Sequence, residues 1–138
     1  MAKKRRTPAQ LFTRRTYNIF RHQKDRAKEA GVSLDYKLDD LRRLIREALG
    51  DYCPHCQTVL TIQNLNVDHR LPLQRGGRHT RENLGVICER CNQIKGNMDV
   101  SEYDWLLEAL AVMHVEARRN VLARIRAGGM ITCKKRAA

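Results

Sequence analysis

Two pairs of cysteines constrain this chain more than any other feature of its sequence. Cys53 and Cys56 flank a Pro-His dipeptide, Cys88 and Cys91 flank a Glu-Arg dipeptide, and 31 residues separate the pairs. Two C-x2-C pairs can supply four thiolates in the tetrahedral arrangement that zinc prefers. Four cysteines fill the coordination shell and leave no open position for a substrate. The sequence therefore predicts a structural zinc ion, while the fifth cysteine, Cys133, is expected to take no part.

Disulfide bonds and a redox motif are the alternatives for these cysteines. Disulfides persist in oxidising compartments, and the N-terminal sequence MAKKRR does not resemble a secretory signal. A thioredoxin-like motif needs one C-x2-C pair in a βαβ setting, which the pattern does not favour. No run approaches 18 apolar residues, so no membrane-spanning helix is expected. These observations favour a cytoplasmic protein that holds zinc.

Hydrophobic periodicity and capping residues predict a single α+β domain in the 138 residues. Thr7, Pro8 and Gln10 form a helix start, and Gly31 is a natural stop. The expected elements are a helix over 8–30, a helix over 38–48, short strands at 59–62, 65–67 and 84–87, a short helix over 91–97 and a long helix over 101–127. The first two strands are expected to pair through a turn at 63–64, and Ser101 is expected to cap the long helix.

Positive charge is concentrated in the two flanks of the chain, whose net charge is +12. Residues 1–30 carry a net charge of +8 and residues 115–138 carry +6, whereas residues 51–100 carry about +1. Basic flanks around a nearly neutral centre favour arms that hold nucleic-acid phosphates; solvated helix faces, and a nuclear address at 3–6, are the alternatives. The candidate DNA contacts in the N-terminal flank are Lys3, Lys4, Arg5, Arg6, Arg14 and Arg15.

Between the cysteine pairs lie residues suited to phosphodiester hydrolysis. Asp68 and His69 directly follow a predicted strand, and Asn92 follows the last cysteine of the second pair. A neutral histidine can take a proton from water near pH 7, and a hard cation prefers carboxylate and amide oxygens. Zinc binding would bring the ends of this segment together. A surface Asp-His pair and an asparagine used only as a helix cap are the alternatives.

The segment 53–97 resembles the HNH endonuclease family, in its zinc-stapled subgroup. The resemblance covers the two cysteine pairs and the positions quoted above, together with Pro72, Gly76-Gly77, Asn83-Leu84 and Lys95. It implies a ββα-metal (His-Me finger) centre in which His69 is the general base, Asp68 and Asn92 hold the catalytic metal, and Asn83 holds the loop and orients the base. Asparagine at the third signature position keeps an oxygen ligand and favours Mg²⁺, with Mn²⁺ or another divalent ion able to substitute.

With this resemblance, the chain is expected to be one HNH nuclease domain. Residues 1–50 would form a basic helical extension, 51–100 the zinc-stapled catalytic core, 101–127 the C-terminal helix and 128–138 a basic tail. Further candidate phosphate contacts in the core are Arg70, Arg75, Arg78 and Lys95. His79 is a candidate for protonating the leaving group.

The predicted function is metal-dependent DNA cleavage by a water that His69 activates, leaving a 5′-phosphate and a 3′-hydroxyl, in a phage- or bacterium-encoded monomer or weak dimer. Two alternatives stay open. One is a zinc-ribbon DNA-binding module without catalysis. The other is a nuclease subunit of a larger machine for DNA packaging, restriction or homing.

Overall fold

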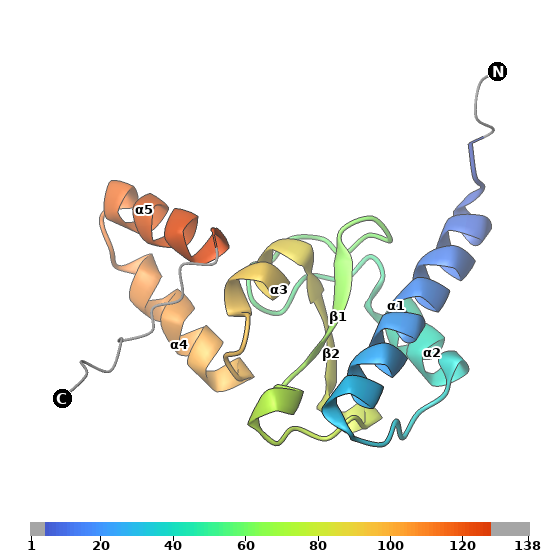
Figure 1. The fold of residues 1–138 in the computed structure, drawn as a ribbon. Helices are drawn as coiled ribbons and strands as arrows, with labels where there is room; N and C mark the ends of the chain where they lie inside the picture. Colours follow the sequence, from blue (N-terminus) through green and yellow to red (C-terminus); the bar gives the residue numbers. More distant parts are fainter. Residues whose placement is uncertain (1–4, 128–138) are drawn as a thin grey trace.

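A computed structural model describes residues 5–127, which form helices packed around a two-stranded antiparallel sheet (Figure 1). The expected α+β fold class is confirmed. In chain order the described elements are α1 (Pro8–Ala30), α2 (Leu38–Ala48), β1 (Leu65–His69), β2 (Leu84–Cys88), α3 (Glu89–Lys95), α4 (Val100–Ala111) and α5 (Val115–Arg126), with short 3-10 helices at Leu73–Arg75 and Arg81–Asn83. Lys3, Lys4, Cys133 and the predicted tail 128–138 lie outside the described residues.

Both N-terminal helices begin and end where the sequence predicts. The Thr7 hydroxyl accepts the backbone N–H of Gln10, and the Gln10 side chain accepts the backbone N–H of Thr7. Pro8 occupies the first turn of α1, and Gly31 ends the helix with a φ of 66°, a conformation in which glycine is least strained. Helix α2 packs against α1. These elements were predictable because their signals are local in the sequence.

The predicted hairpin between 59–62 and 65–67 is wrong. Instead, β1 pairs antiparallel with β2, and the register places Leu65 opposite Cys88 and His69 opposite Leu84. Thr61 and Asn64 exchange side-chain and backbone hydrogen bonds in a tight turn, and Leu65 N–H donates to the Thr61 carbonyl. Those backbone groups are therefore not available for a sheet. Val59 forms only an isolated bridge with Tyr52.

The single long helix predicted over 101–127 is also wrong, because the chain breaks between α4 and α5. Asp99, rather than Ser101, caps α4 through a reciprocal pair of hydrogen bonds with Glu102. His114 has extended backbone angles and begins α5. The break lets α5 fold back so that Leu122 and Ile125 reach the same core that Leu106 and Leu107 of α4 contact. A straight helix would carry these later side chains away from the core.

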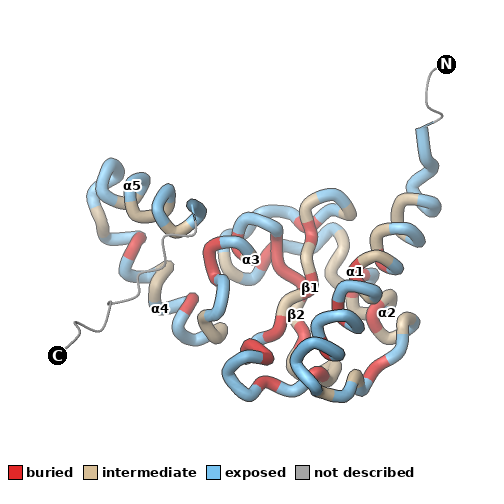
Figure 2. The backbone as a smooth tube through the Cα atoms, in the orientation of Figure 1, coloured by how far each residue is buried: buried red, intermediate tan, exposed pale blue. Residues whose placement is uncertain are grey.

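The core lies between the sheet and the helices on both sides of it. In Figure 1 the pair α1 and α2 lies on one side of the two strands, the pair α4 and α5 on the other, and α3 beside the strands. Figure 2 shows that buried positions concentrate on the strands, on α3 and on the inner sides of α1 and α2. Ile45 and Leu65 are fully buried there, and so is Tyr103 of α4.

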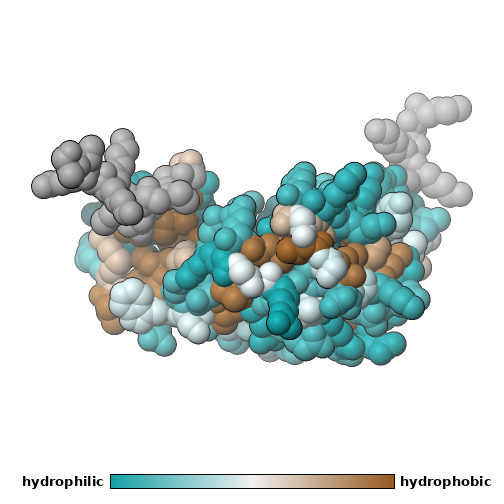
Figure 3. Space-filling model, turned by 60° about the horizontal axis from the view of Figure 1, so that its bottom comes forward, coloured by the Kyte–Doolittle hydropathy of each residue, from teal (hydrophilic) through white to brown (hydrophobic). Residues whose placement is uncertain are grey.

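Helix α5 contributes no buried residue, and apolar side chains lie open around the α4–α5 pair, including Trp105, which is 74% exposed. On the face drawn in Figure 3, hydrophobic residues gather at the end that carries α4 and α5 and also form a band across the middle of the molecule, bordered by hydrophilic side chains. Among the described helices none is both long and apolar enough to cross a membrane.

Candidate metal centre and active site

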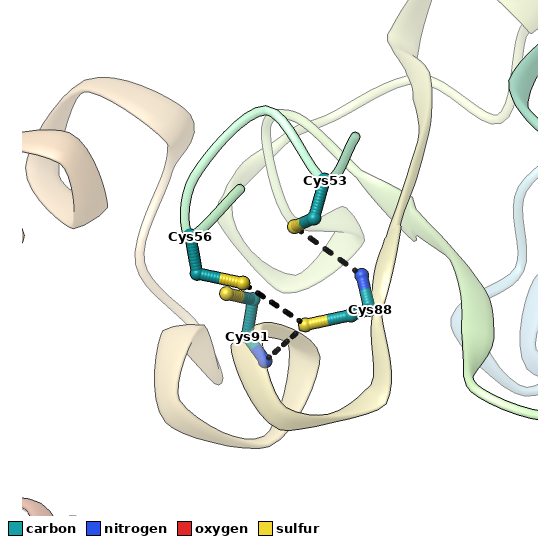
Figure 4. A group of neighbouring side chains, drawn as sticks. All are labelled: Cys53, Cys56, Cys88 and Cys91. Carbon is teal, nitrogen blue, oxygen red and sulfur yellow. Dashed lines mark hydrogen bonds between the residues drawn. The ribbon is translucent and has the colours of Figure 1, made fainter. Parts of the chain in front are cut away.

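The four paired cysteines converge on one point (Figure 4). Cys53 and Cys56 lie in the loop after α2, Cys88 ends β2 and Cys91 lies in the first turn of α3. All four sulfur atoms lie within 4.8 Å of one another. A tetrahedral zinc ion with Zn–S bonds of about 2.3 Å separates its sulfur ligands by about 3.8 Å. The donor set and spacing therefore fit a metal ion such as zinc.

Hydrogen bonds from backbone N–H groups to sulfur orient two of the thiols. The backbone N–H of Cys88 donates to Cys53 Sγ and that of Cys91 donates to Cys88 Sγ, both at 3.4 Å. Helix α3 begins two residues earlier than predicted, at Glu89, so that Cys88 is its N-cap. Burial raises the pKa of the thiols of Cys88 and Cys91. Burial disfavours the charged thiolates, and a cation among the sulfur atoms would offset this cost by stabilising them.

His55, inside the first cysteine pair, connects the metal centre to α4. Its Nδ1 lies 2.7 Å from Oδ1 of Asp104, and its ring packs edge-on against Tyr103 with 4.8 Å between the ring centroids. With these contacts His55 is a tether for α4. The cysteine spacing does not require His55 as a zinc ligand, and four sulfur atoms already complete the shell.

Asp68 and His69, adjacent at the end of β1, face opposite sides of the sheet, as successive residues of a strand do. Asp68 points towards α3, where its Oδ2 lies 2.6 Å from Nζ of Lys95. The same Nζ donates to the backbone carbonyl of His69 at 3.0 Å. Lys95 is 1% exposed. Lys95, predicted as a phosphate contact, therefore has its ammonium group buried against the end of β1 rather than open to solvent.

His69 contacts a second histidine. Its Nε2 lies 2.7 Å from Nδ1 of His79, and the His79 Nε2 lies 2.8 Å from the backbone carbonyl oxygen of Gln23 in α1. Both rings are 1% exposed. Burial, with a contribution from nearby His79, Arg26 and Lys95, lowers the pKa of His69 to about 3, so the ring is neutral at physiological pH. Both ring nitrogens of His79 are engaged within the protein, so neither is free in this structure for the leaving-group protonation that the sequence suggested.

Asn83 ties together the two ends of the loop between the strands. Its Nδ2 donates to the carbonyls of Leu71 and Arg78 at 2.9 and 2.8 Å, and its Oδ1 accepts the Leu71 N–H at 2.9 Å. Its own carbonyl accepts the N–H of Arg70, the residue after His69, at 2.8 Å. The side chain therefore holds the loop, while its backbone holds the chain immediately after the candidate base.

Asn92 lies in α3, one turn before Lys95, and is partly buried. Within residues 5–127 its side chain makes no hydrogen bond to protein, and Oδ1 of Asp68 accepts none. Lys95, on the same helix as Asn92, contacts Asp68. Asp68 therefore faces α3, the helix that also carries Asn92, whereas His69 faces α1. Lys95 thus connects α3, the helix that carries Asn92, to the end of β1, where Asp68 and His69 face opposite sides of the strand.

The predicted phosphate contacts differ in their freedom. Arg14 and Arg78 are exposed, and Arg6 and Arg14 line a shallow pocket together with Arg15. Arg5 is also exposed. Arg15, in contrast, donates to the Leu65 carbonyl and the Asn66 side chain.

Two arginines of the segment 51–100, Arg70 and Arg75, also form hydrogen bonds within the protein. Arg75 pairs with both carboxylate oxygens of Glu102 and reaches the Asn97 carbonyl. Arg70 lies along β2, with its Nε 3.4 Å from the Leu84 carbonyl. Arg15, Arg70 and Arg75 therefore form hydrogen bonds within the protein, which leaves their guanidinium groups less free to bind phosphate.

Gln23 of α1 is the main residue of this region that sequence reasoning missed. It is 4% exposed, its backbone carbonyl meets His79 and its side-chain Nε2 donates to the Val67 carbonyl of β1 at 3.1 Å. A signal was present, because Gln23 falls four residues after Ile19 and four before Ala27, both buried on the same helix face. A polar residue inside an apolar stripe indicates a specific hydrogen-bond partner.

The comparisons with known proteins match the segment that carries these features. A family model described as HNH endonuclease matches residues 53–103. A CRISPR-associated endonuclease Cas9 of Corynebacterium diphtheriae is 46% identical over 46 residues, covering 33% of this chain and 4% of that protein. Another, of Actinomyces naeslundii, is 33% identical over 90 residues, covering 61% and 8%.

The chain thus spans less than a tenth of the length of these two relatives. Residues 53–103 contain both cysteine pairs, the end of β1, Asn83 and α3. The resemblance of this segment to the HNH endonuclease family is confirmed.

Proposed function

We propose that this protein is a metal-dependent DNA endonuclease in which His69 activates a water molecule for attack on phosphorus. The observation that supports the proposal is that the family-matched segment carries Asp68 and His69 at the end of β1 and Asn92 on α3, the helix that contacts Asp68 through Lys95. The names of the two relatives, both endonucleases, support the same reaction class. The four-cysteine centre, formed by the loop after α2, the end of β2 and the start of α3, would hold a structural zinc ion.

Asp68 and Asn92 would hold the catalytic divalent ion. Their donor atoms fit a hard cation, because carboxylate and amide oxygens are the ligands that Mg²⁺ accepts. Lys95 engages one oxygen of Asp68 and leaves Oδ1 for a second cation. When bound, a divalent ion supplies neutralisation of the charge that develops on the phosphate and the departing oxygen.

His69 would take the proton from the attacking water at Nδ1. This nitrogen is buried and has no hydrogen-bond partner among the described residues, whereas Nε2 is engaged by His79. As the new P–O bond forms, the P–O3′ bond breaks and the 3′ oxygen takes a proton from solvent. The products would be a 5′-phosphate and a 3′-hydroxyl. Asn83 would support the step by holding the chain that follows His69.

Exposed basic residues would hold the DNA backbone outside the reacting phosphate. Arg5, Arg6 and Arg14 on or before α1 are free to contact phosphate, as is Arg78 in the loop between the strands. Phosphate contacts carry no base sequence information. Binding through these residues would therefore depend strongly on salt and little on DNA sequence.

A DNA-binding module without catalysis is the second candidate. Two observations favour it: Lys95 already neutralises Asp68, and the ring of His69 is 1% exposed. A nuclease subunit of a larger, phage- or bacterium-encoded machine is a variant of the first proposal. In the two relatives, the segment that matches this chain is a small part of a much longer protein.

A plasmid-nicking assay separates these candidates. Supercoiled DNA is incubated with the wild-type protein or with His69→Ala, with and without Mg²⁺, and binding is measured in parallel by gel shift. The proposal expects Mg²⁺-dependent nicking that falls about 10²- to 10⁴-fold in His69→Ala, while DNA affinity changes little. Binding without nicking by the folded, zinc-loaded wild-type protein would support the second candidate instead.

A further inference from the structure

His79 stands between the candidate base and the N-terminal helix, and its surroundings leave it little freedom. Its ring lies edge-on to Tyr36 with 5.3 Å between the centroids, and its backbone carbonyl accepts the N–H of Asp35 at 3.0 Å. Its two ring nitrogens meet His69 and the Gln23 carbonyl. Residues from α1, from the loop before α2 and from β1 therefore hold this one side chain.

The donors and acceptors in this chain of contacts can be assigned from their chemistry. The backbone carbonyl of Gln23 can only accept, so His79 must carry a proton on Nε2. A neutral His79 then has a lone pair on Nδ1. The 2.7 Å contact with His69 needs one proton between the nitrogens, and His69 Nε2 must supply it. A neutral His69 is left with its lone pair on Nδ1.

The alternative assignment would place a second proton on His79 and make it an imidazolium ion that donates to His69. That ion would be 1% exposed. A positive charge on His79 would lie in a site that already has the positive charge of Arg26 nearby. No acidic side chain bonds to either ring within residues 5–127. The neutral assignment is therefore the one that the surroundings favour.

We propose that His79 is a positioning residue for the reaction: together with the Gln23 carbonyl, it holds His69 in the tautomer that keeps Nε2 protonated and Nδ1 free. This inference rests on the proposed role of His69 as the general base. A hydrogen bond to the second nitrogen of a working histidine sets which nitrogen carries the proton. The basic N-terminal helix is then part of the catalytic apparatus as well as a surface for DNA.

The position of α1 relative to β1 is fixed by the same glutamine. The Gln23 side chain donates to the carbonyl of Val67, two residues before His69, while its backbone carbonyl receives His79. Helix α1 thus contacts the strand that carries the base and the residue that orients the base. A shift of α1 would change both contacts together.

Substitutions of His79 separate hydrogen bonding from packing. Asparagine places an acceptor oxygen close to the position of Nδ1, so His79→Asn keeps a partner for the His69 N–H. Glutamine places an amide nitrogen close to the position of Nε2, so His79→Gln keeps the donor to Gln23 but not the acceptor. His79→Leu removes both. Tyr36→Phe is the matched control, because it keeps the ring contact and removes only a hydroxyl that has no partner among the described residues.

The experiment combines imidazole ¹⁵N NMR with kinetics on the full chain. In the wild type we expect His69 to show a protonated Nε2 and an unprotonated Nδ1, assigned by comparison with His69→Gln. His79→Leu and His79→Gln should lose this single tautomer and lower kcat about 10- to 100-fold with little change in KM. His79→Asn should recover most of both, and Tyr36→Phe should change neither.

The outcomes distinguish this inference from the proposed function. A protonated Nδ1 on His69 in the wild type overturns the inference whatever the activity. Wild-type kcat in folded His79→Leu or His79→Gln overturns it while leaving the nuclease intact. If His79→Leu does not fold, the comparison of the asparagine and glutamine variants decides. If the wild type has the expected tautomer but cuts no DNA under any divalent ion, the proposed function is wrong and the positioning role fails with it.

Discussion

The ammonium nitrogen of Lys95 lies 2.6 Å from Oδ2 of Asp68, and both groups are shielded from solvent, with side-chain exposures of 1% and 15%. The buried ammonium group of Lys95 thus lies directly beside Asp68, the candidate metal ligand. Lys95 also donates to the His69 carbonyl, so it links the end of β1 to α3. The pair gives Asp68 a structural role in addition to the catalytic role that we propose for it.

Substituting Lys95 should therefore destabilise the fold. Lys95→Met leaves the Asp68 charge without its partner, and we expect the free energy of unfolding to fall by about 3 kcal/mol, since removing one member of a buried pair leaves the other uncompensated. Asp68→Asn should also destabilise. Urea unfolding of both single variants and the double variant checks this. Additive losses of stability, with no coupling between the two sites, would contradict it.

Zinc should be required for the fold around the cysteine cluster. Cys88→Ala removes a thiol that is 4% exposed, and we expect bound zinc to fall from about one ion per chain to near zero, because three sulfur ligands leave the shell open. Residues 51–100 should become sensitive to protease. Cys133→Ala is the control and should change neither property. Elemental analysis and limited proteolysis measure both, and a folded, protease-resistant Cys88→Ala without zinc would count against a structural metal.

Local signals in the sequence were sufficient for some elements and not for others. The caps at Thr7 and Gly31 and the strand 84–87 could be predicted because neighbouring residues determine them. The partner of β1 could not, because pairing with β2 joins segments separated by residues 70–83. The segment 59–62 has strand-forming residues, but the turn at Thr61 uses its backbone groups.

The candidate site was predictable in its residue types and not in its arrangement. Asp68 and His69 were identified as a pair, but the strand was expected to end at Val67, so their placement on opposite faces was not foreseen. The observed strand continues to His69, and its twofold alternation separates the two side chains. The contact of His79 with the Gln23 carbonyl joins residues 56 positions apart, and no local pattern announces such a contact.

Removing charge from the outer face of α1 should weaken DNA binding without disturbing the fold. Deleting residues 1–30 is unsuitable, because Ile19, Gln23 and Ala27 are buried. Arg14→Ala is better, since Arg14 is exposed, and it should reduce the slope of log K against log salt by roughly 0.9, the value expected for one phosphate that is no longer neutralised. Arg75→Ala is the matched control, because Glu102 already engages that guanidinium. Equal slopes for Arg14→Ala and the wild type, measured by fluorescence anisotropy, would mean that Arg14 faces solvent in the complex.

Asn83→Ala should loosen the loop without removing the base. The side chain makes three hydrogen bonds to the backbone of Leu71 and Arg78, and their removal should lower the free energy of unfolding by about 2 kcal/mol. Cleavage should fall less than in His69→Ala, because the imidazole remains present but is less well held. Hydrogen exchange of the amide N–H of Leu71 reports the loop directly. If Asn83→Ala kept wild-type protection of this amide and wild-type cleavage, Asn83 would have no role in holding the loop or in supporting the base.

Asn92 offers the cleanest test of the proposed catalytic metal, because Asp68 also has a structural partner in Lys95. Asn92→Ala removes an amide oxygen that bonds to no protein group within residues 5–127, so zinc content and the free energy of unfolding should stay close to those of the wild type. Cleavage should need a higher Mg²⁺ concentration, because one of two protein ligands is gone, and raising Mg²⁺ should restore part of the rate. His69→Ala, which lacks the base rather than a ligand, should not be rescued at any Mg²⁺ concentration. Titrating Mg²⁺ in the nicking assay with both variants measures this difference, and an unchanged Mg²⁺ midpoint in Asn92→Ala would remove Asn92 from the metal site.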